Sequence, residues 1–345
     1  MWIDFSNKKI IFPKNDSIWS NSIKSFLNDW NDNNSVIEIK TSGTTGNCKK
    51  IFLKKKYIIQ RAIESVKYLK LNKKNIIGLL CLSPNFIASK MFLIRSMIFK
   101  WKILCIPPSY NPLKNIKIYN FDIASMIPMQ VFFSIKYLKK IKNILIGGYS
   151  ISNYLINKLK NISSTNFYAT YGMTETYGHI ALCKINNNID NYYFRLLKNI
   201  NIKIDKRNCL IVNFPKMNNI FIKTNDIVHL KNNNTFKWIG RYDNIINTGG
   251  IKVIPEQLEN IISNFIPYNK RFFISSIPDK IIGEKIILII EGSFFKIKIP
   301  ERLFKGEKKY LKPKIIFFIK NFEENFLGKI RKKNITKKIM KKYKY

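Results

Sequence analysis

The stretch Thr41-Ser42-Gly43-Thr44-Thr45-Gly46-Asn47-Cys48-Lys49-Lys50 is the most informative part of the chain for its fold and its chemistry. It places four hydroxyl side chains and two glycines within six positions and then adds two lysines. Backbone N–H groups and hydroxyls of such a loop can close around an anionic phosphate chain. The stretch is not a Walker A loop, because the spacing G-x-x-x-x-G-K-[ST] is absent. A solvated Ser/Thr/Gly turn is the alternative interpretation.

The composition indicates a globular chain with an unusual charge. Its 345 residues suffice for two domains, and 46% of them are hydrophobic. Lys and Arg total 61 against 21 Asp and Glu, which gives a formal net charge of +40. Binding to nucleic acid or to an acidic membrane would fit this charge. However, the lysines are spread along the whole chain with Ile and Asn, which share A/T-rich codons. We therefore predict a compositionally drifted gene and no specific nucleic-acid partner.

The cysteines, histidines and apolar stretches argue against a disulfide-bonded protein, a His-rich metal protein and a membrane-spanning protein. Five cysteines with no C-x-x-C pair are typical of a reducing compartment, so we predict a cytoplasmic protein. Two histidines exclude a His-rich metal site. The longest apolar stretches, around Ile76–Cys81 and Met91–Ile98, are shorter than the ~18 residues of a membrane span, and no signal-peptide pattern is present. The sequence leaves the oligomeric state open.

Strand and helix patterns alternate through the first half of the chain. We expect strands at Val36–Lys40, Ile76–Leu82, Ile103–Ile106, Ile123–Pro128 and Ile144–Ile146, and helices at Ser22–Trp30, Lys56–Leu69 and Phe86–Phe99. This alternation predicts a parallel α/β sheet, in which ligands bind beyond the carboxyl ends of the strands. The loops Thr41–Gly46, Gly147-Gly148 and Tyr171–Glu175 each follow an expected strand, so they should converge on one side.

The expected pattern of secondary structure changes from about Asp205. Short strands separated by polar breaks predict a small antiparallel subdomain, at Leu210–Val212, Ile220–Lys223, Val228–Leu230 and Thr235–Ile239. A turn-rich stretch and a basic tail follow. We place a domain boundary there, between a large α/β domain (1–242) and a small α+β domain (243–345).

A second motif is Tyr171-Gly172-Met173-Thr174-Glu175. A carboxylate is unexpected at an anion site unless it holds a cation. Mg²⁺ prefers hard oxygen ligands and bridges phosphates, so Glu175 is a candidate magnesium ligand. The alternative is a strand–turn–helix segment with Thr174 as the N-cap.

Three more motifs follow along the chain: Thr224-Asn225-Asp226, the run Gly240–Glu259, and Asn325-Phe326-Leu327-Gly328-Lys329-Ile330-Arg331. Together with the first two, they resemble the signatures of the adenylate-forming superfamily, which comprises acyl-CoA synthetases, peptide-synthetase adenylation domains and luciferases. The five motifs occur in the order of the family and span residues 41–331. The resemblance implies a large adenylation domain, truncated at its N-terminus relative to typical members, and a small mobile C-terminal domain. It also implies ATP, Mg²⁺ and CoA as ligands.

The resemblance implies roles for individual residues. The nucleotide would be bound by Thr41, Ser42, Gly43, Thr44, Thr45, Gly46, Lys49, Tyr171, Gly172, Asp226 and Arg241, with the ring of Tyr171 flanking adenine and Asp226 accepting hydrogen bonds from the ribose. Thr174, Glu175 and Lys329 would be catalytic, with Thr174 donating to the α-phosphate and Glu175 holding Mg²⁺. Asp243 would be the hinge, and Gly249 and Gly250 would admit the pantetheine thiol of CoA. Asn225 replaces the usual glycine, and because Asn tolerates positive φ we expect a turn there. Cys48 also departs from the small or apolar residue that is usual.

Three further stretches resemble the o-succinylbenzoate–CoA ligases of menaquinone biosynthesis: Leu80-Cys81-Leu82-Ser83-Pro84, Ile127-Pro128-Met129-Gln130 and Gly178-His179-Ile180-Ala181-Leu182. That substrate carries two carboxylates, and the candidates to bind the distal one are Lys90, Arg95, Gln130 and His179. A snorkelling cation, a capping amide and a core histidine are the structural alternatives. Two other functions stay open: a ligase for a different carboxylic acid, and a non-catalytic basic relic that binds nucleic acid.

Overall fold

The computed structural model describes residues 1–7, 9–11, 17–42, 48–116, 120–185, 192–324 and 330–343, without the side chains of residues 10, 41, 42, 48 and 307. The predicted phosphate-loop residues Gly43, Thr44, Thr45 and Gly46 and the predicted catalytic Lys329 therefore lie outside the described residues.

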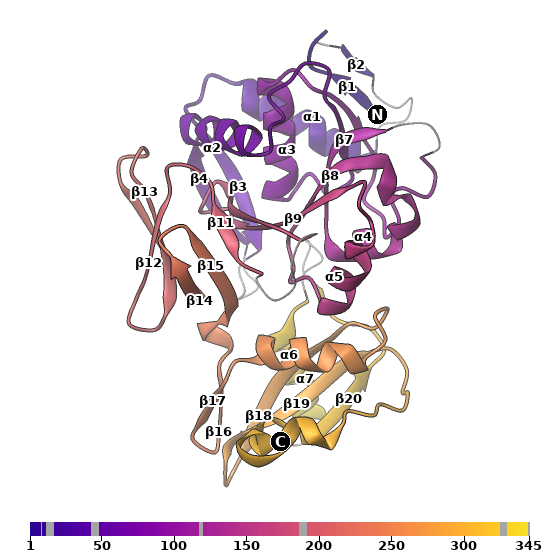
Figure 1. Cartoon of the computed structure of the whole chain (residues 1–345), viewed down its shortest axis with the longest axis vertical. Helices are drawn as coiled ribbons and strands as arrows, with labels where there is room; N and C mark the ends of the chain where they lie inside the picture. The colour runs from indigo at the N-terminus through magenta and orange to yellow at the C-terminus, as the bar shows by residue number, and fades with distance from the viewer. Residues whose placement is uncertain are drawn as a thin grey trace.

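One sheet of 13 strands runs through the N-terminal body (Figure 1). From one edge to the other its strands are β12 (Asn201–Ile204), β13 (Cys209–Phe214), β14 (Ile220–Asn232), β15 (Thr235–Arg241), β11 (Phe194–Leu196), β10 (Gly178–Lys184), β9 (Asn166–Met173), β8 (Ile141–Ile146), β7 (Phe121–Met126), β5 (Ile77–Leu80), β6 (Lys102–Cys105), β1 (Trp2–Asp4) and β2 (Lys9–Ile11).

The middle of this sheet is parallel, as the alternating pattern predicts. Neighbours from β6 through β5, β7 and β8 to β9 all pair in parallel. Their apolar runs are buried, for example Leu79 and Leu80 at 0% exposure. The strands from β10 to β12 are antiparallel and form the predicted antiparallel extension.

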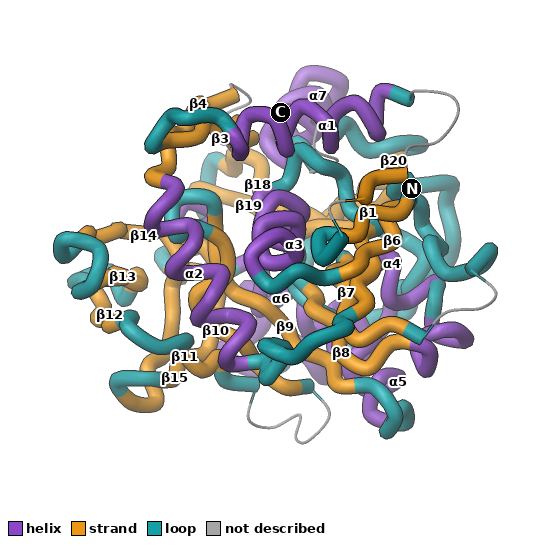
Figure 2. The backbone as a smooth tube through the Cα atoms, turned by 90° about the horizontal axis from the view of Figure 1, so that it is seen from above, coloured by secondary structure: helices purple, strands orange, loops and turns teal. Residues whose placement is uncertain are grey.

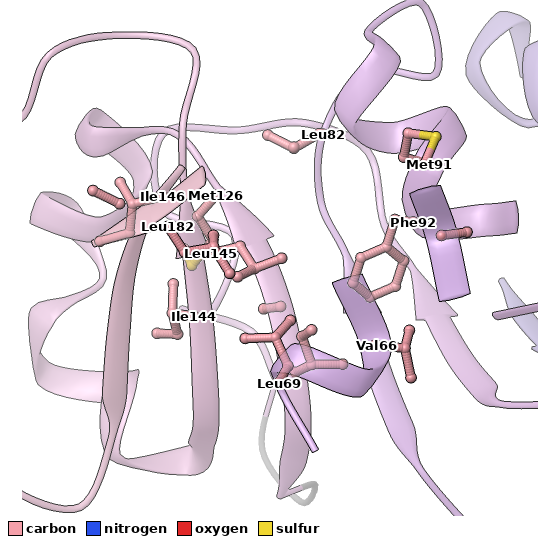
Figure 3. Close-up of a cluster of buried hydrophobic side chains, with 14 of the residues drawn as sticks. Val66, Leu69, Leu82, Met91, Phe92, Met126, Ile144, Leu145, Ile146 and Leu182 are labelled. Carbon is pink, nitrogen blue, oxygen red and sulfur yellow. The ribbon is translucent and has the colours of Figure 1, made fainter. Parts of the chain in front are cut away.

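Helices cover the parallel strands: α1 (Ile18–Asn31), α2 (Lys55–Tyr68), α3 (Ile87–Ile98), α4 (Pro128–Phe133) and α5 (Asn153–Lys160), with a 3-10 turn η1 (Ile135–Lys140). Helices α2 and α3 lie side by side (Figures 1 and 2). Figure 3 shows Val66 of α2 and Phe92 of α3 in one buried cluster with Leu145 and Leu182 of the sheet. This cluster is the main core, and it fixes α2 and α3 against β10.

The first expected strand is not part of the large sheet. Strand β3 (Val36–Ser42) pairs in antiparallel register with β4 (Cys48–Lys54), and the sequence pattern had not predicted β4. The phosphate loop therefore joins two strands of a hairpin rather than a strand and a helix. Ile37, Ile39 and Leu53 bury the hairpin's inner face in the main core. The basic positions Lys49 and Lys50 are exposed, which gives β4 a polar face that masks its strand pattern.

The C-terminal body holds a smaller sheet with a helix on each face. Its elements are η2 (Tyr242–Asn244), β16 (Ile246–Thr248), β17 (Ile251–Val253), α6 (Pro255–Ile262), η3 (Ser263–Phe265), β18 (Phe272–Asp279), β19 (Gly283–Glu291), η4 (Glu301–Phe304), η5 (Gly306–Leu311), β20 (Ile315–Ile319) and α7 (Lys332–Tyr343). Leu258 of α6 and Ile335 of α7 belong to two separate hydrophobic clusters of this body. The boundary predicted at residues 242 and 243 stays a proposal. It falls between Phe236 in the core of the N-terminal body and Ile246 in that of the C-terminal body.

The two bodies meet through aromatic side chains. The ring of Tyr268 lies 3.8 Å from the ring of Phe132 in α4 and 5.4 Å from that of Tyr154 in α5, measured between centroids. Within the described residues, no helix combines the length and hydrophobicity that crossing a membrane requires.

Candidate active site

The Tyr-Gly-Met-Thr-Glu motif forms the end of β9 and the turn that leads into β10. The backbone N–H of Tyr177 donates to the carbonyl of Thr174 at 2.9 Å, and the Oγ1 of buried Thr176 accepts a hydrogen bond from the N–H of Met173 at 2.9 Å. The alternative of a strand–turn–helix segment with Thr174 as N-cap is wrong, because the chain continues as a strand. The motif is a tight hairpin.

Gly172 is required by the close approach of the two hairpin strands. A Cβ at this position would lie 2.2 Å from the carbonyl oxygen of Gly178 and 2.4 Å from the Cα of His179. Opposite Gly172 the register shifts between His179 and Ala181, which is a β-bulge. Bulges change the direction in which side chains point, and here the bulged strand places His179 toward α2 and α3.

The first group of polar side chains, which we call the Asp226 cluster, comprises Tyr171, Asp226, Trp238, Arg241 and Asp243. The hydroxyl of Tyr171 donates to Asp226 Oδ2 at 2.7 Å, and Trp238 Nε1 donates to Asp226 Oδ1 at 3.2 Å. Arg241 Nη1 lies 3.6 Å from Asp226 Oδ1. Asp226 is 6% exposed, so three protein partners stabilise this buried carboxylate.

Tyr171 is held as a neutral donor in this cluster. Burial raises the pKa of Tyr171 well above its usual value, and the negative charge of Asp226 adds to the rise. Its ring lies edge-on to Phe236, with the centroids 5.0 Å apart. The structure therefore places Tyr171 beside Asp226, and the contact of its ring with adenine and the role of Asp226 toward ribose stay predictions.

Arg241 links Asp226 to the predicted hinge. Its Nε and Nη2 donate to the two carboxylate oxygens of Asp243 at 3.0 and 2.9 Å. Burial raises the pKa of Asp243, but the hydrogen bond and charge of Arg241 outweigh it, and the pKa lies below its usual value. One guanidinium therefore bridges the carboxylate of Asp226 in the sheet and the carboxylate of Asp243, the predicted hinge residue.

The turn expected at Thr224-Asn225-Asp226 is wrong. These residues lie inside the long strand β14, where the pairing with β13 shifts register between Cys209 and Ile211. The φ angle of Asn225 is not positive, so the backbone does not adopt the conformation that the expected turn needs. A bulge in a continuous strand replaces the turn, and it still presents Asp226 to Tyr171.

The second group lies on the other side of the hairpin and comprises Arg61, Glu64, Ser65, Arg95 and His179; we call it the arginine–histidine cluster. His179 Nε2 lies 2.8 Å from Ser65 Oγ, and His179 Nδ1 lies 3.4 Å from Arg95 Nη2. Arg61 pairs with Glu64 and donates to the carbonyl of His179 at 3.4 Å.

This cluster holds more positive than negative charge. Arg61 and Arg95 are 1% and 2% exposed. Glu64 pairs with Arg61, and among the described residues no carboxylate forms a salt bridge with Arg95, whose Nε has no hydrogen-bond partner. Burial, and then the charge of Arg61, lowers the pKa of Arg95 to about 9. A buried guanidinium without a counter-ion is costly, so this position is suited to an anionic ligand.

The other two candidates for the acid lie elsewhere. The ammonium of Lys90 lies 5.0 Å above the ring of Phe26 in α1, and Gln130 donates from Nε2 to the carbonyls of Cys81 and Ser109 at 2.9 and 3.1 Å. Because Gln130 is 3% exposed and both its N–H groups are used, we leave it out of the proposed acid site. Lys90 is also left out, because it faces α1 rather than His179.

Glu175 is exposed on the turn of the hairpin, one residue after half-buried Thr174. The described part of the chain contains no group of three or more His, Cys, Asp or Glu side chains that could hold a metal ion. Mg²⁺ is usually bound by one or two carboxylates together with phosphate oxygens and water. The exposed carboxylate of Glu175 fits such a site, in which the nucleotide supplies the remaining ligands.

Strand pairing and backbone angles show where the remaining predicted residues lie. Thr41 pairs with Lys49 and Ser42 with Cys48 at the end of the β3–β4 hairpin, which brackets residues 43–47. Gly249 and Gly250 have φ of +58° and +79° in the two-residue turn between β16 and β17, where two such angles favour Gly-Gly. Figure 1 shows this hairpin in the C-terminal body, extending away from the large sheet.

Sequence patterns did not identify Arg61, Glu64, Ser65 or Trp238. Arg61 and Ser65 lie on the buried face of α2, among Tyr57, Ile58, Ala62 and Val66. A cation and a hydroxyl that interrupt an apolar helical face are the signal that could have found them.

The class of the protein is shown by a comparison with known families. The family model for AMP-binding enzymes matches residues 14–209, more than half of the chain, and the chain belongs to this family. Its fold is that of the adenylate-forming enzymes, and the chain is similar to o-succinylbenzoate–CoA ligases among other members.

Three relatives illustrate the similarity. A 2-succinylbenzoate–CoA ligase from Lactococcus lactis is 26% identical over 208 residues, which cover 56% of this chain and 46% of that protein. The match thus spans about half of the curated relative. An acyl-CoA synthetase (AMP-forming)/AMP-acid ligase II-like protein from Dyadobacter fermentans is 29% identical, with a TM-score of 0.62 and 96% coverage of both chains. O-succinylbenzoate coenzyme A synthetase from Bacillus subtilis, solved with ATP and magnesium ion, has a TM-score of 0.72 at 18% identity, covering 87% of this chain and 69% of that one. The last comparison supports the fold alone.

Proposed function

We propose that the chain is an ATP-dependent, AMP-forming acid–thiol ligase that activates a carboxylate as an acyl-adenylate and transfers the acyl group to CoA. We further propose that its acid is o-succinylbenzoate, as in menaquinone biosynthesis. Membership of the AMP-binding family supports the first statement, and the named relative from L. lactis supports the second.

The Asp226 cluster supports nucleotide binding. One carboxylate oxygen of Asp226 accepts a hydrogen bond from the hydroxyl of Tyr171 at 2.7 Å. The other oxygen contacts both Trp238 and Arg241. Each carboxylate oxygen can accept two hydrogen bonds, and Arg241 at 3.6 Å forms an ion pair rather than a hydrogen bond, so each oxygen keeps one lone pair for a ribose hydroxyl. In this proposal Arg241 binds ribose or phosphate, and Thr174 donates to the α-phosphate.

The acid carboxylate attacks the α-phosphorus of ATP, and pyrophosphate leaves. Negative charge builds on the bridging and leaving oxygens in the transition state. Cations that already lie next to these oxygens stabilise this charge. When bound by Glu175 and phosphate oxygens, Mg²⁺ would neutralise part of this charge. We assign Lys329 to the same task. A unit charge ~4 Å away contributes roughly 4 kcal/mol at an effective dielectric near 20, about three decades of rate.

The thiol of CoA then attacks the carbonyl carbon of the acyl-adenylate, the bond from that carbon to the phosphate oxygen breaks, and AMP leaves. This second step requires different groups at the same centre. We propose that the body formed by residues 243–345 rotates about Asp243 between the two half-reactions, and that the Gly249-Gly250 turn then admits the thiol.

The buried guanidinium of Arg95 is the single observation that carries the choice of acid. It lies beside His179, whose backbone pairs with Gly172 of the nucleotide motif, and it has no carboxylate partner in the described residues. The acid site would thus adjoin the site of adenylation. A second carboxylate on the substrate would supply the missing charge.

A ligase for another acid is the second candidate. The similarity to the D. fermentans acyl-CoA synthetase-like protein, which covers 96% of both chains, favours it. The deciding experiment is CoA-coupled turnover with ATP, Mg²⁺ and o-succinylbenzoate, run beside an ATP–pyrophosphate exchange panel of carboxylic acids. Exchange with other acids and none with o-succinylbenzoate would replace our choice of acid.

A further inference from the structure

We propose that Ser65 and His179 act as positioning residues: they hold Arg95 in a fixed orientation for an anionic group of the acid and do not themselves contact the acid. The inference rests on the proposed function for the identity of the acid, but its structural part can be tested without any substrate.

The direction of the hydrogen bonds follows from the chemistry of arginine. A guanidinium can only donate, so His179 Nδ1, 3.4 Å from Arg95 Nη2, must be the unprotonated nitrogen. A neutral imidazole then carries its proton on Nε2, which donates to Ser65 Oγ at 2.8 Å. Ser65 therefore fixes the tautomer that allows His179 to accept from Arg95.

The surroundings keep His179 neutral. Helix α2 supplies Arg61 and Glu64, helix α3 supplies Arg95, and the loop before β12 contributes the carbonyl of Lys198, to which Arg61 donates. Burial lowers the pKa of His179 well below its usual value, and the charges of Arg95 and Arg61 lower it further. A protonated ring would present an N–H to the guanidinium and displace Arg95.

The arrangement leaves His179 with no lone pair or proton for a ligand. Both ring nitrogens have protein partners, whereas Arg95 keeps an unused Nε. The Nε of Arg61 is also unused, but Arg61 pairs with Glu64, so in this proposal the acid contacts Arg95. The hydrogen-bonded chain from Ser65 through His179 restricts the rotamers of the Arg95 side chain.

The first test uses Ser65→Ala, with Ser96→Ala as a matched control. Ser96 is also a buried helical serine, but its hydroxyl donates to the carbonyl of Phe92 in its own helix at 2.8 Å. We expect Ser65→Ala to raise KM for o-succinylbenzoate about tenfold, the equivalent of one net hydrogen bond, while KM for ATP and kcat stay within about twofold. A uniform change in both KM values, or the same change in Ser96→Ala, would overturn the proposal.

The second test is independent of turnover. The chain holds two histidines, so ¹⁵N-histidine spectra of the His229→Gln variant report His179 alone. We expect a ring that is neutral and protonated on Nε2 at pH 7 and that stays neutral at the usual histidine pKa of about 6.5, and loss of this single tautomer in Ser65→Ala. An imidazolium at pH 7, or a proton on Nδ1, would overturn the proposal. If wild type does not turn over o-succinylbenzoate, the proposed function fails, and these spectra still decide the role of Ser65.

Discussion

The two polar clusters on either side of the β9–β10 hairpin have opposite charge balances. The Asp226 cluster contains one guanidinium and two carboxylates, and all of these groups are paired with one another. The arginine–histidine cluster contains two buried guanidiniums and one carboxylate. Under the proposed function this difference is expected. The Asp226 cluster would bind neutral ribose hydroxyls and needs no charge from a ligand, whereas the arginine–histidine cluster would bind a carboxylate that supplies the missing negative charge.

The largest effect is expected for Asp226→Ala. This change leaves the hydroxyl of Tyr171, the indole N–H of Trp238 and the guanidinium of Arg241 without their shared acceptor. We expect ATP–pyrophosphate exchange to fall about 10³-fold and the free energy of unfolding, measured by urea denaturation, to fall by roughly 3 kcal/mol. Asp205→Ala removes a half-buried carboxylate that pairs with Arg207 in the turn between β12 and β13, and it should leave exchange unchanged. An equal loss of exchange in both variants would contradict a specific role of Asp226 in nucleotide binding.

Arg95→Met should separate activity from stability. We expect kcat/KM for o-succinylbenzoate to fall about 100-fold, the loss of a charge-assisted contact. The free energy of unfolding should stay the same or rise by about 1–2 kcal/mol, because an unmatched buried charge is removed. A loss of stability like that of Asp226→Ala would show that Arg95 already has a counter-ion in the protein, and the two clusters would not differ as described.

The pH dependence of stability provides a third comparison. The pKa of His179 is lowered in the folded protein, so below about pH 6.5 the unfolded chain binds a proton that the folded chain does not. Stability should therefore fall as the pH drops from 6.5, by up to about 1.4 kcal/mol per pH unit, until His179 also becomes protonated. Urea midpoints of wild type and His179→Asn between pH 7.5 and 5 measure this slope. It should be shallower in the variant, and parallel curves would contradict a neutral, half-buried histidine with a lowered pKa.

The smallest effect is expected at the other end of the molecule. Gly250 has φ of +79° and open space around its Cβ position, so Gly250→Ala adds backbone strain without a clash. We expect strain of about 1 kcal/mol and a roughly fivefold slower transfer of the acyl group to CoA. Pyrophosphate exchange should be unaffected. An equal loss in both half-reactions would argue against a role of this turn in the thiol step alone.

Much of the fold could be predicted because the decisive signals are local. The apolar run at Ile76–Leu82 and the helical pattern at Phe86–Phe99 correspond to β5 and α3 within two residues. Strand β4 was missed because its lysines face solvent and break the apolar pattern. The expected turn at Asn225 was wrong because pairing with β13 extends the strand through it.

The candidate site was only partly predictable, because long-range contacts decide it. Motif spacing identified Tyr171, Asp226 and Arg241, and the structure brings them together. Motifs could not distinguish Arg95 from Lys90, since both lie on α3, and only the packing shows that Arg95 faces His179 while Lys90 faces Phe26. Arg61 and Ser65 could be recognised as members of the site only from the packing of α2 against β10, which brings both side chains to His179.

The most direct test of the central claim compares o-succinylbenzoate with the monocarboxylate analogue that keeps the carboxylate to be adenylated and lacks the other one. Adenylation of the two acids is measured as kcat/KM in wild type and in Arg95→Met. We predict that wild type prefers the dicarboxylate by about 100-fold and that the variant prefers it by less than about threefold. A preference that survives unchanged in Arg95→Met would contradict the claim that the unmatched arginine selects the acid.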